Sequence, residues 1–329
     1  MTTMRSDVRA LLDQLAAAGG PGIEEQTPQA ARDGMRAMLP VVDLPMPELA
    51  TVRELSVPAE HGTVPALLLD PRAHRDPGPL VVWYHGGGFV TGGLDSHRSF
   101  AADLARRLDL PVLLVAYRLA PEAPYPAAPD DAETVARWAA ANPAELGRAV
   151  DALVLGGDSA GATLAIATAM ALRDTPAPLP VLAHLVLYPA TDHTRPYPSH
   201  REFAEGHLLT EASRRWYYAH YRPTVTDVRA SPLLGEAAGL PPAVVVTAGL
   251  DPLRDEGRAY AAALVTAGVP TTFLEAEGTI HAFAVLRRAL PSSQRDIAAA
   301  TAALRAMLEG AGRPVSHPVG VDRAATAAS

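Results

Sequence analysis

Short apolar runs alternate with amphipathic segments over most of the chain from residue 80 onward. The runs have the length of buried strands, and the segments between them have the apolar periodicity of helices. We expect strands at 80–84, 112–117, 152–155, 185–188, 243–248 and 271–275, and helices at 95–108, 130–141, 160–173, 256–267 and 294–308. Asp130 and Glu133 would form a capping box at the start of one of these helices. The alternation predicts an α/β fold, in which a mostly parallel central sheet is flanked by helices on both faces.

Two helices are expected before this alternation begins. Apolar residues at helical spacing over 8–15 predict a first helix that ends at Gly19-Gly20. A second helix would begin with Thr27 as its N-cap and Pro28 in its first turn, and would run towards Leu39.

An antiparallel strand pair and an insertion complete the predicted elements. Residues 51–57 and 63–69 predict two strands joined by a turn, which would begin the sheet. Residues 191–223 interrupt the later alternation with polar and aromatic side chains, and Thr210 is suited to cap a helix that runs to Tyr221. This composition favours a helical lid over a pocket; the alternative is a surface excursion that packs its own aromatic rings.

These elements divide the chain into three parts. We expect residues 1–50 to form N-terminal helices and residues 51–312 to form the main α/β domain, with the insertion at about 191–223. Residues 313–329 contain Pro, Ser, Thr and Ala without periodicity, and we expect them to be a disordered tail.

The composition excludes several kinds of chemistry and partner. All 28 cationic residues are Arg, so a lysine nucleophile or Schiff base is excluded. The absence of Cys excludes disulfides, a thiolate nucleophile and cysteine-ligated zinc. The net charge of -8 argues against nucleic acid or an anionic membrane as partner. Asp7 and Asp13 interrupt any signal-peptide apolar region, and no apolar run reaches the ~18 residues of a membrane span, so we expect a cytoplasmic protein.

The segment Gly157-Asp158-Ser159-Ala160-Gly161 lies between a predicted strand and a predicted helix. In that setting the G-x-S-x-G pattern is typical of a nucleophile elbow, a sharp turn that presents a serine hydroxyl above the sheet. The two glycines let backbone pass closely and tolerate unusual dihedral angles. Ser159 is therefore the candidate nucleophile, and it requires a base, an acid and an oxyanion hole.

Three consecutive glycines follow the strand at 80–84 and are preceded by His85. Backbone amides in such a loop can point at a ligand, as an oxyanion hole requires. We expect the amides of Gly87 and Gly88, together with that of Ala160, to form this hole. His85 is expected to orient the loop by hydrogen bonding rather than to transfer protons.

The base should be a histidine, because a serine hydroxyl needs a partner whose pKa lies near the working pH. In this architecture the base and acid follow the serine in the order Ser, Asp or Glu, His. His281 fits that order, since it follows the strand at 271–275 in a loop that contains Gly278. The other histidines considered lie in the aromatic insertion or in the tail: His193, His200, His207, His220 and His317.

The acid should orient the imidazole and stabilise its charged form. Asp251 directly follows the strand at 243–248 and is the first choice, while Asp192 follows another strand and is the second. Asp255 and Glu256 instead resemble first-turn residues of the next helix, where the helix dipole favours them.

With these parts identified, the chain resembles the hormone-sensitive-lipase-like group of α/β-hydrolase esterases. The matching segments are His85 to Val90, Tyr117 to Glu122, Gly157 to Gly161, Asp251 to Glu256 and Ile280 to Phe283. The resemblance implies a cap over the site, built from the N-terminal helices within residues 1–50 and from the insertion at about 191–223, and often a homodimer. It also implies Ser159, His281 and Asp251 as the catalytic triad, with oxyanion amides from Gly87, Gly88 and Ala160.

Two departures from the family pattern lie beside these motifs. The elbow continues as Ala162-Thr163 where the family often has Gly-Asn, and Ala282 follows His281 where the family usually has Gly. We expect these departures to affect substrate fit and not the reaction type. The residues expected to contact substrate are Phe89, Thr163, Phe203, Leu208 and Trp216.

The predicted function is hydrolysis of short- to medium-chain carboxylic esters through a Ser-His-Asp acyl-enzyme mechanism, without metal or cofactor. The expected partner is a small-molecule ester. The same triad would also serve hydrolysis of lactones, carbamates or amides, or acyl transfer to an alcohol. A non-catalytic small-molecule receptor on the same fold is less favoured, because all three triad residue types are present.

Overall fold

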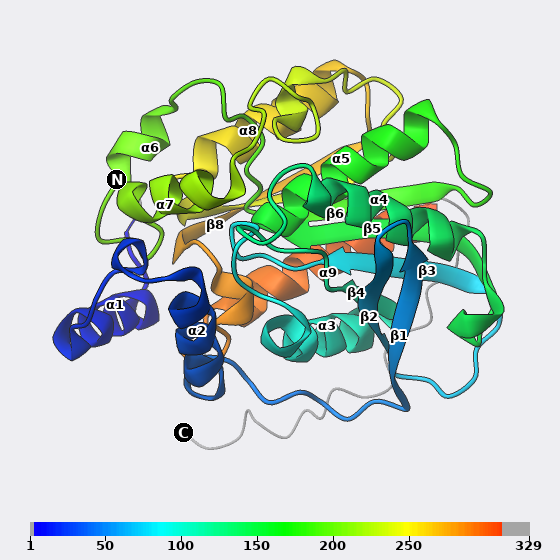
Figure 1. Ribbon diagram of the computed structural model, residues 1–329, viewed down its shortest axis with the longest axis horizontal. Coiled ribbons are helices and arrows are strands. Elements are labelled where there is room, and N and C mark those ends of the chain that lie inside the picture. Colours follow the sequence, from blue (N-terminus) through cyan, green and yellow to red (C-terminus); the bar gives the residue numbers. More distant parts are fainter. Residues whose placement is uncertain (1–2, 311–329) are drawn as a thin grey trace.

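The computed structural model describes residues 3–310, which contain an eight-stranded sheet in the order β1-β2-β4-β3-β5-β6-β7-β8 (Figure 1). The pairs β1–β2 and β2–β4 are antiparallel, and every other neighbouring pair is parallel. The mostly parallel sheet with an antiparallel edge is therefore confirmed. The strands are β1 Thr51–Ala59, β2 Gly62–Asp70, β3 Gly78–Tyr84, β4 Val112–Val115, β5 Val150–Asp158, β6 Val181–Leu187, β7 Ala243–Leu250 and β8 Thr271–Ile280.

Helices cover both faces of the sheet, with α3 and α9 on one side and α4, α5 and α8 on the other (Figure 1). The bounds are α3 Leu94–Leu108, α4 Ala127–Ala140, α5 Ala160–Asp174, α8 Arg254–Thr266 and α9 Ser293–Gly310. Successive strand residues point to opposite faces, so Leu153 and Leu155 join one hydrophobic cluster while Val154 joins the other. Burial on both faces explains why these strands are continuous apolar runs.

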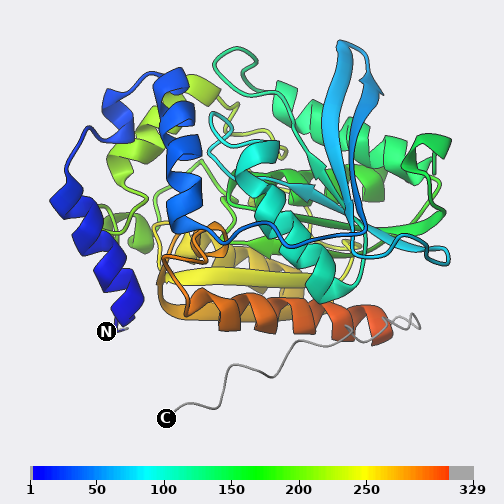
Figure 2. The ribbon, with the colours of Figure 1, turned by 90° about the horizontal axis from the view of Figure 1, so that it is seen from below.

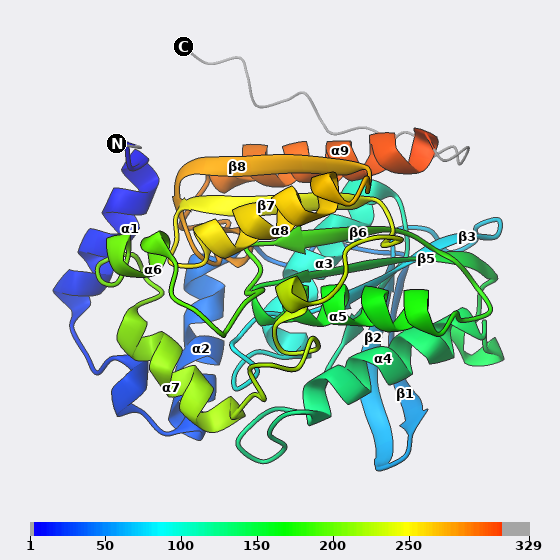
Figure 3. The same cartoon turned by 90° about the horizontal axis from the view of Figure 1, so that it is seen from above.

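Within residues 3–310, short connections contain four 3-10 helices: η1 Ile23–Glu25, η2 Ala144–Leu146, η3 Pro232–Leu234 and η4 Phe283–Val285. The remaining helices, α1 Ser6–Ala18, α2 Pro28–Val42, α6 Pro198–Glu202 and α7 Glu211–Tyr221, gather with η1 at one end of the sheet (Figures 1 and 3). We refer to these helices and η1 as the cap. The cap has an N-terminal part (α1, η1 and α2) and an inserted part (α6 and α7). Trp216 of α7 connects them, because its indole N–H donates to the Gln26 carbonyl at 3.1 Å.

The start of the chain is also tied to the last helix. The Arg5 guanidinium pairs with the Asp296 carboxylate, and the Ser292 amide donates to the Asp7 carboxylate at 2.8 Å. Figure 2 shows the beginning of α1 beside the beginning of α9. These contacts fix one end of the cap against the main domain.

Several predicted boundaries differ from the structure. The helix predicted at 130–141 begins at Ala127, because the Asp130 amide already donates to the Pro126 carbonyl at 3.1 Å. The capping box of Asp130 and Glu133 is therefore wrong: their carboxylates pair with arginines instead. Among the strands, β4 ends at Val115 rather than at 117, and β8 continues to Ile280. The strands β5 and β6 begin earlier than predicted, at Val150 and Val181.

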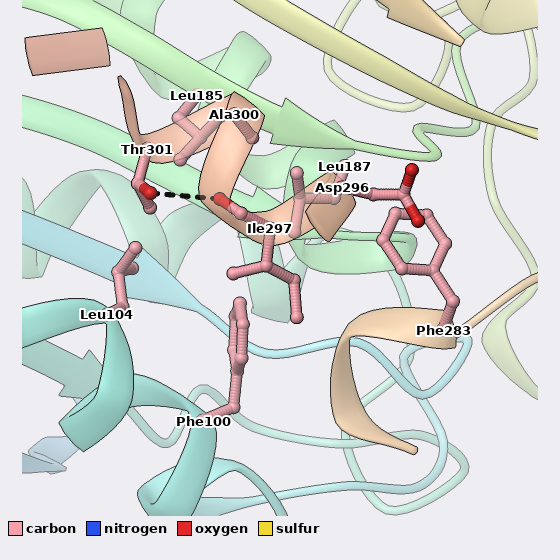
Figure 4. A pocket seen from close by; sticks show the side chains of 9 residues that line it. All are labelled: Phe100, Leu104, Leu185, Leu187, Phe283, Asp296, Ile297, Ala300 and Thr301. Atoms are coloured by element: carbon pink, nitrogen blue, oxygen red, sulfur yellow. Dashed lines mark hydrogen bonds between the residues drawn. The ribbon is translucent and has the colours of Figure 1, made fainter. Parts of the chain in front are cut away.

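A small cavity between α3, β6 and α9 belongs to the packing of the core (Figure 4). Its volume is about 10 Å³, and it is lined mainly by apolar side chains, among them Phe100, Leu187 and Ile297. That volume is about the least that can hold one water molecule. The cavity therefore has no room for a substrate.

Among residues 3–310, no helix has both the length and the apolar character required to cross a membrane. The predicted tail at 313–329 lies outside the described residues.

Candidate active site

Ser159 stands in the tight turn between β5 and α5. Its backbone has φ 54° and ψ -121°, a sparsely populated combination for a residue with a Cβ. Gly161 has no room for a Cβ, which would clash with the Tyr84 carbonyl, and a Cβ on Gly157 would clash with the backbone of Gly161. The two glycines thus allow the close backbone approach that the sequence pattern predicted. The strained turn aims the serine hydroxyl beyond the end of the sheet.

The structure brings Ser159, His281 and Asp251 together from three strand ends. His281 directly follows β8, and its Nε2 lies 2.8 Å from the Ser159 Oγ. Its Nδ1 lies 2.7 Å from the Asp251 Oδ2. The other Asp251 oxygen accepts the Leu253 amide at 2.9 Å, so the loop after β7 fixes the carboxylate. The arrangement has the geometry of a nucleophile, a base and an orienting acid.

The sequence predicted that His281 lies in a loop that contains Gly278, and that prediction is wrong. Gly278 is inside β8, where it has φ 70° and its carbonyl accepts the Arg5 amide at 3.0 Å. The additional strand residues pair with the end of β7, for example Ile280 with Leu250. The base is consequently held at the end of a hydrogen-bonded strand rather than in a loop.

Asp192, the second candidate acid, forms hydrogen bonds with residues outside the triad. Asp192 accepts hydrogen bonds from Thr194 at 2.5 Å and from the Tyr197 hydroxyl at 2.8 Å. Burial would raise the pKa of its carboxyl, but these hydrogen bonds and one from Arg195 lower it to about 2. The carboxylate therefore orders the segment after β6 and is not hydrogen-bonded to His281.

The glycine loop after β3 lies against the elbow. Gly87 and Gly88 have φ values of 119° and 59°, which glycine adopts without strain. Within residues 3–310, the amides of Gly87, Gly88 and Ala160 donate no hydrogen bond. They are the donors that an oxyanion would require.

His85 organises this loop through contacts with residues outside the triad. Its Nδ1 lies 2.7 Å from the Gly86 carbonyl, and its ring stacks on Tyr117 with centroids 4.2 Å apart. Burial, with a smaller contribution from the charge of His97, lowers the pKa of His85 to about 3. The imidazole is therefore neutral at neutral pH, as expected for an orienting residue.

The side chains predicted to contact substrate lie at different depths. Phe89, Thr163, Phe203 and Trp216 are buried, whereas Leu208 is 38% exposed. Phe89 stacks on an aromatic ring at the end of α7, with centroids 3.9 Å apart. The Thr163 hydroxyl donates to a carbonyl in the segment after β6 at 2.6 Å. Contact of these residues with substrate stays a prediction.

The structure adds a residue that sequence reasoning did not single out. Tyr217 of α7 lies over the glycine loop, so closely that a Cβ on Gly88 would clash with its ring. The only signal in the sequence was its place among the aromatic residues of the insertion. Tyr217 therefore forms part of the wall beside the candidate oxyanion hole.

Comparison with known proteins agrees with this geometry. A family described as having the alpha/beta hydrolase fold matches residues 81–285. The carboxylic ester hydrolase LipN of Mycobacterium tuberculosis is 39% identical over 269 residues, which are 77% of this chain and 69% of LipN. An ethyl acetate hydrolase of Pseudomonas putida is 37% identical, over 70% of this chain and 75% of that protein.

Among solved structures, the ester hydrolase EH1AB1 from the metagenome of Lake Arreo has a TM-score of 0.88 and 36% identity. The match covers 94% of this chain and all of that one. The chain therefore belongs to the α/β-hydrolase family, and its resemblance to the hormone-sensitive-lipase-like esterases is confirmed.

Proposed function

We propose that this protein hydrolyses carboxylic esters of short to medium acyl chain, with Ser159 as nucleophile, His281 as base and Asp251 as acid. The observation that carries the proposal is the continuous pair of contacts, 2.8 Å and 2.7 Å, that joins the three side chains. The class of enzyme, a serine ester hydrolase, is also that of the esterases to which the chain is similar.

The reaction proceeds in two similar halves. Ser159 Oγ attacks the ester carbonyl while its proton moves to His281 Nε2, and the carbonyl oxygen becomes an oxyanion. The amides of Gly87, Gly88 and Ala160 stabilise that charge. The oxyanion collapses, and the alcohol leaves with the proton from His281. Water then attacks the acyl-enzyme in the same way and releases the carboxylic acid.

The proposed chain length rests on the surroundings of the triad. The aromatic residues of α7 cover the glycine loop, and Phe89 is fixed beneath them by stacking. The relative from Pseudomonas putida is named for an ester with a two-carbon acyl group. Both observations favour a compact acyl group over a long one.

The test is hydrolysis of a series of p-nitrophenyl esters, from acetate to palmitate, by the purified protein. We expect the highest kcat/KM between acetate and octanoate. Ser159→Ala should reduce the rate on p-nitrophenyl butyrate to background, and Asp251→Asn should reduce kcat by about 10⁴. Ser56→Ala, which changes an exposed serine of β1, is the matched control and should be fully active.

Equal activity of the wild-type protein and Ser159→Ala would contradict the proposal. Turnover of lactones or amides but not of simple esters would favour the alternative substrates. Stoichiometric binding without turnover would favour a receptor. Light scattering in the same samples would test the homodimer that the family resemblance implies.

A further inference from the structure

A buried polar cluster connects the elbow to the glycine loop beneath the candidate active site. The Asp158 side chain, only 2% exposed, is at its centre. Its Oδ1 accepts the Gly86 amide at 3.1 Å and the Trp83 indole N–H at 3.3 Å, while its Oδ2 lies 3.2 Å from His97 Nε2. The proposed mechanism gives Asp158 no role, although it directly precedes Ser159.

His97 is supplied by α3 and is itself 4% exposed. Its Nδ1 lies 2.8 Å from the Ser96 Oγ, and that oxygen also lies 2.9 Å from the Gly93 carbonyl. These contacts hold the ring beside Asp158. With hydrogen on Nε2, the imidazole donates to the Asp158 carboxylate.

The Gly86 amide lies 3.2 Å from His97 Nε2 as well, but a protonated Nε2 leaves the carboxylate as the acceptor of that amide. Burial alone would raise the pKa of Asp158. The positive charge of His97, with hydrogen bonds from His97 and Trp83, instead holds it below its ordinary value. The carboxylate is thus charged, paired and hydrogen-bonded on both oxygens.

This arrangement bears on catalysis through the backbone of the glycine loop. Gly86 is the residue before Gly87, and a Cβ on Gly86 would clash with the Asp158 carboxylate. A hydrogen bond to the Gly86 amide therefore restrains the loop immediately before the oxyanion donors. An unpaired carboxylate at this place would oppose the negative charge of the transition state, and the contact with His97 offsets that field.

We propose that Asp158 and His97 are positioning residues for the oxyanion loop: Asp158 holds the Gly86 amide, and His97 holds Asp158 and balances its charge. The inference rests on the proposed ester hydrolysis. Its consequence is that the pair acts on the transition state more than on binding of the substrate.

The first test compares Asp158→Ala with Asp158→Asn. Alanine removes the acceptor, and we expect kcat on p-nitrophenyl butyrate to fall about 10- to 100-fold while KM changes by less than about threefold, because misplaced oxyanion donors affect the transition state. Asparagine keeps an oxygen for the Gly86 amide and can donate to a neutral His97. We expect it to stay within about fivefold of the wild-type kcat.

The second test removes His97 in the same two ways. His97→Leu should lower kcat about 10-fold or more, and His97→Gln, whose amide can donate to Asp158, should recover most of that loss. The matched control is His184→Leu, which also removes a fully buried histidine with a hydrogen bond, in the middle of β6. It should lower stability without changing kcat per folded molecule.

Binding of a trifluoromethyl ketone distinguishes positioning from loss of folded protein, because its hemiketal oxyanion uses the same donors. We expect Asp158→Ala and His97→Leu to weaken this inhibitor about as much as they lower kcat. Unchanged inhibitor affinity, or kcat equal to that of the wild type in folded His97→Leu, would overturn the inference. An inactive wild-type protein would instead overturn the proposed function. If Asp158→Ala does not fold, the His97 pair decides the question.

Discussion

Ala282, the residue after the candidate base, has a φ of 62°, in the left-handed region that glycine adopts more easily. The neighbouring His281 is restrained by β8 and by its contacts with Ser159 and Asp251. The family usually has glycine where this chain has Ala282. The backbone of this chain therefore retains the glycine-like conformation with a side chain present.

Ala282→Gly should for this reason not destabilise the protein. Relief of the left-handed conformation, about 1–2 kcal/mol, offsets the greater entropy that glycine has in the unfolded chain, about 0.5–1 kcal/mol. We expect the free energy of unfolding, measured with urea, to stay constant or rise by up to about 1 kcal/mol. In the control Ala302→Gly, at an exposed position inside α9, it should fall by about 0.5–1 kcal/mol. A similar loss in both variants would contradict the strain at Ala282.

The Tyr217 ring and a φ of 59° both limit which residue can replace Gly88. Gly88→Ala should reduce kcat by about 10²–10³, because a Cβ displaces either the loop or the Tyr217 ring and moves an oxyanion donor. Gly268→Ala is the control: Gly268 has a φ of 76°, but a Cβ added there would meet no atom within 4 Å. It should lower stability and leave kcat unchanged. Equal kcat in the two variants would show that Gly88 does not position the oxyanion.

At the scale of elements, α7 depends on its first residue. The Ser213 amide donates to the Thr210 hydroxyl oxygen at 3.0 Å, and the Thr210 amide donates to the Ser213 hydroxyl oxygen at 2.9 Å. The N-cap predicted from sequence is therefore confirmed, as is Thr27 at the start of α2. The caps were predictable because they depend on residues within one turn of the chain.

Thr210→Ala should lower the free energy of unfolding by about 1 kcal/mol, the usual cost of a lost N-cap. Because α7 carries Tyr217 over the glycine loop, we also expect KM for p-nitrophenyl butyrate to change. Thr210→Asp keeps a capping oxygen at the positive end of the helix and is the control, with stability close to that of the wild type. Equal losses in the two variants would show that the cap bond does not stabilise α7.

At the scale of the whole molecule, buried histidines connect folding to pH. Burial lowers the pKa of His184 to about 4; for His85, burial and to a lesser degree the His97 charge lower it to about 3. Below the ordinary pKa of 6.5, the unfolded chain binds protons at these imidazoles and the folded chain does not. Acid therefore favours the unfolded state until the pH reaches the folded pKa values.

The free energy of unfolding should accordingly fall as pH decreases from about 6.5 to about 4, by up to ~1.4 kcal/mol per pH unit for each such histidine. His184→Gln should reduce this slope by the contribution of about one proton, ~1.4 kcal/mol per pH unit. The slope is measured by urea unfolding between pH 6.5 and 4.5. The same slope in the variant and the wild type would show that His184 is not the titrating group. Above pH 7 the two slopes should agree.

Sequence patterns also predicted the alternating architecture and the order of the triad. Ser159 and Asp251 directly follow β5 and β7, whose predicted ends were 155 and 248, while His281 required an assumed loop that proved to be the end of β8. The error has a physical cause: glycine and charged residues weaken the strand pattern at 275–280, but pairing with β7 extends the strand. The capping box at Asp130 failed similarly, because its spacing was compatible with a cap but the chain had already turned at Pro126.

The sequence by itself determined the alternation of strands and helices and the order of the three triad residues, because periodicity and turn chemistry act over a few neighbouring residues. Only the tertiary structure decided what lies around the candidate nucleophile. The ring of Tyr217 over Gly88 depends on how the cap packs, and the pair of Asp158 with His97 joins residues from β5 and α3. Such contacts arise when distant elements are buried together, and no local pattern encodes them.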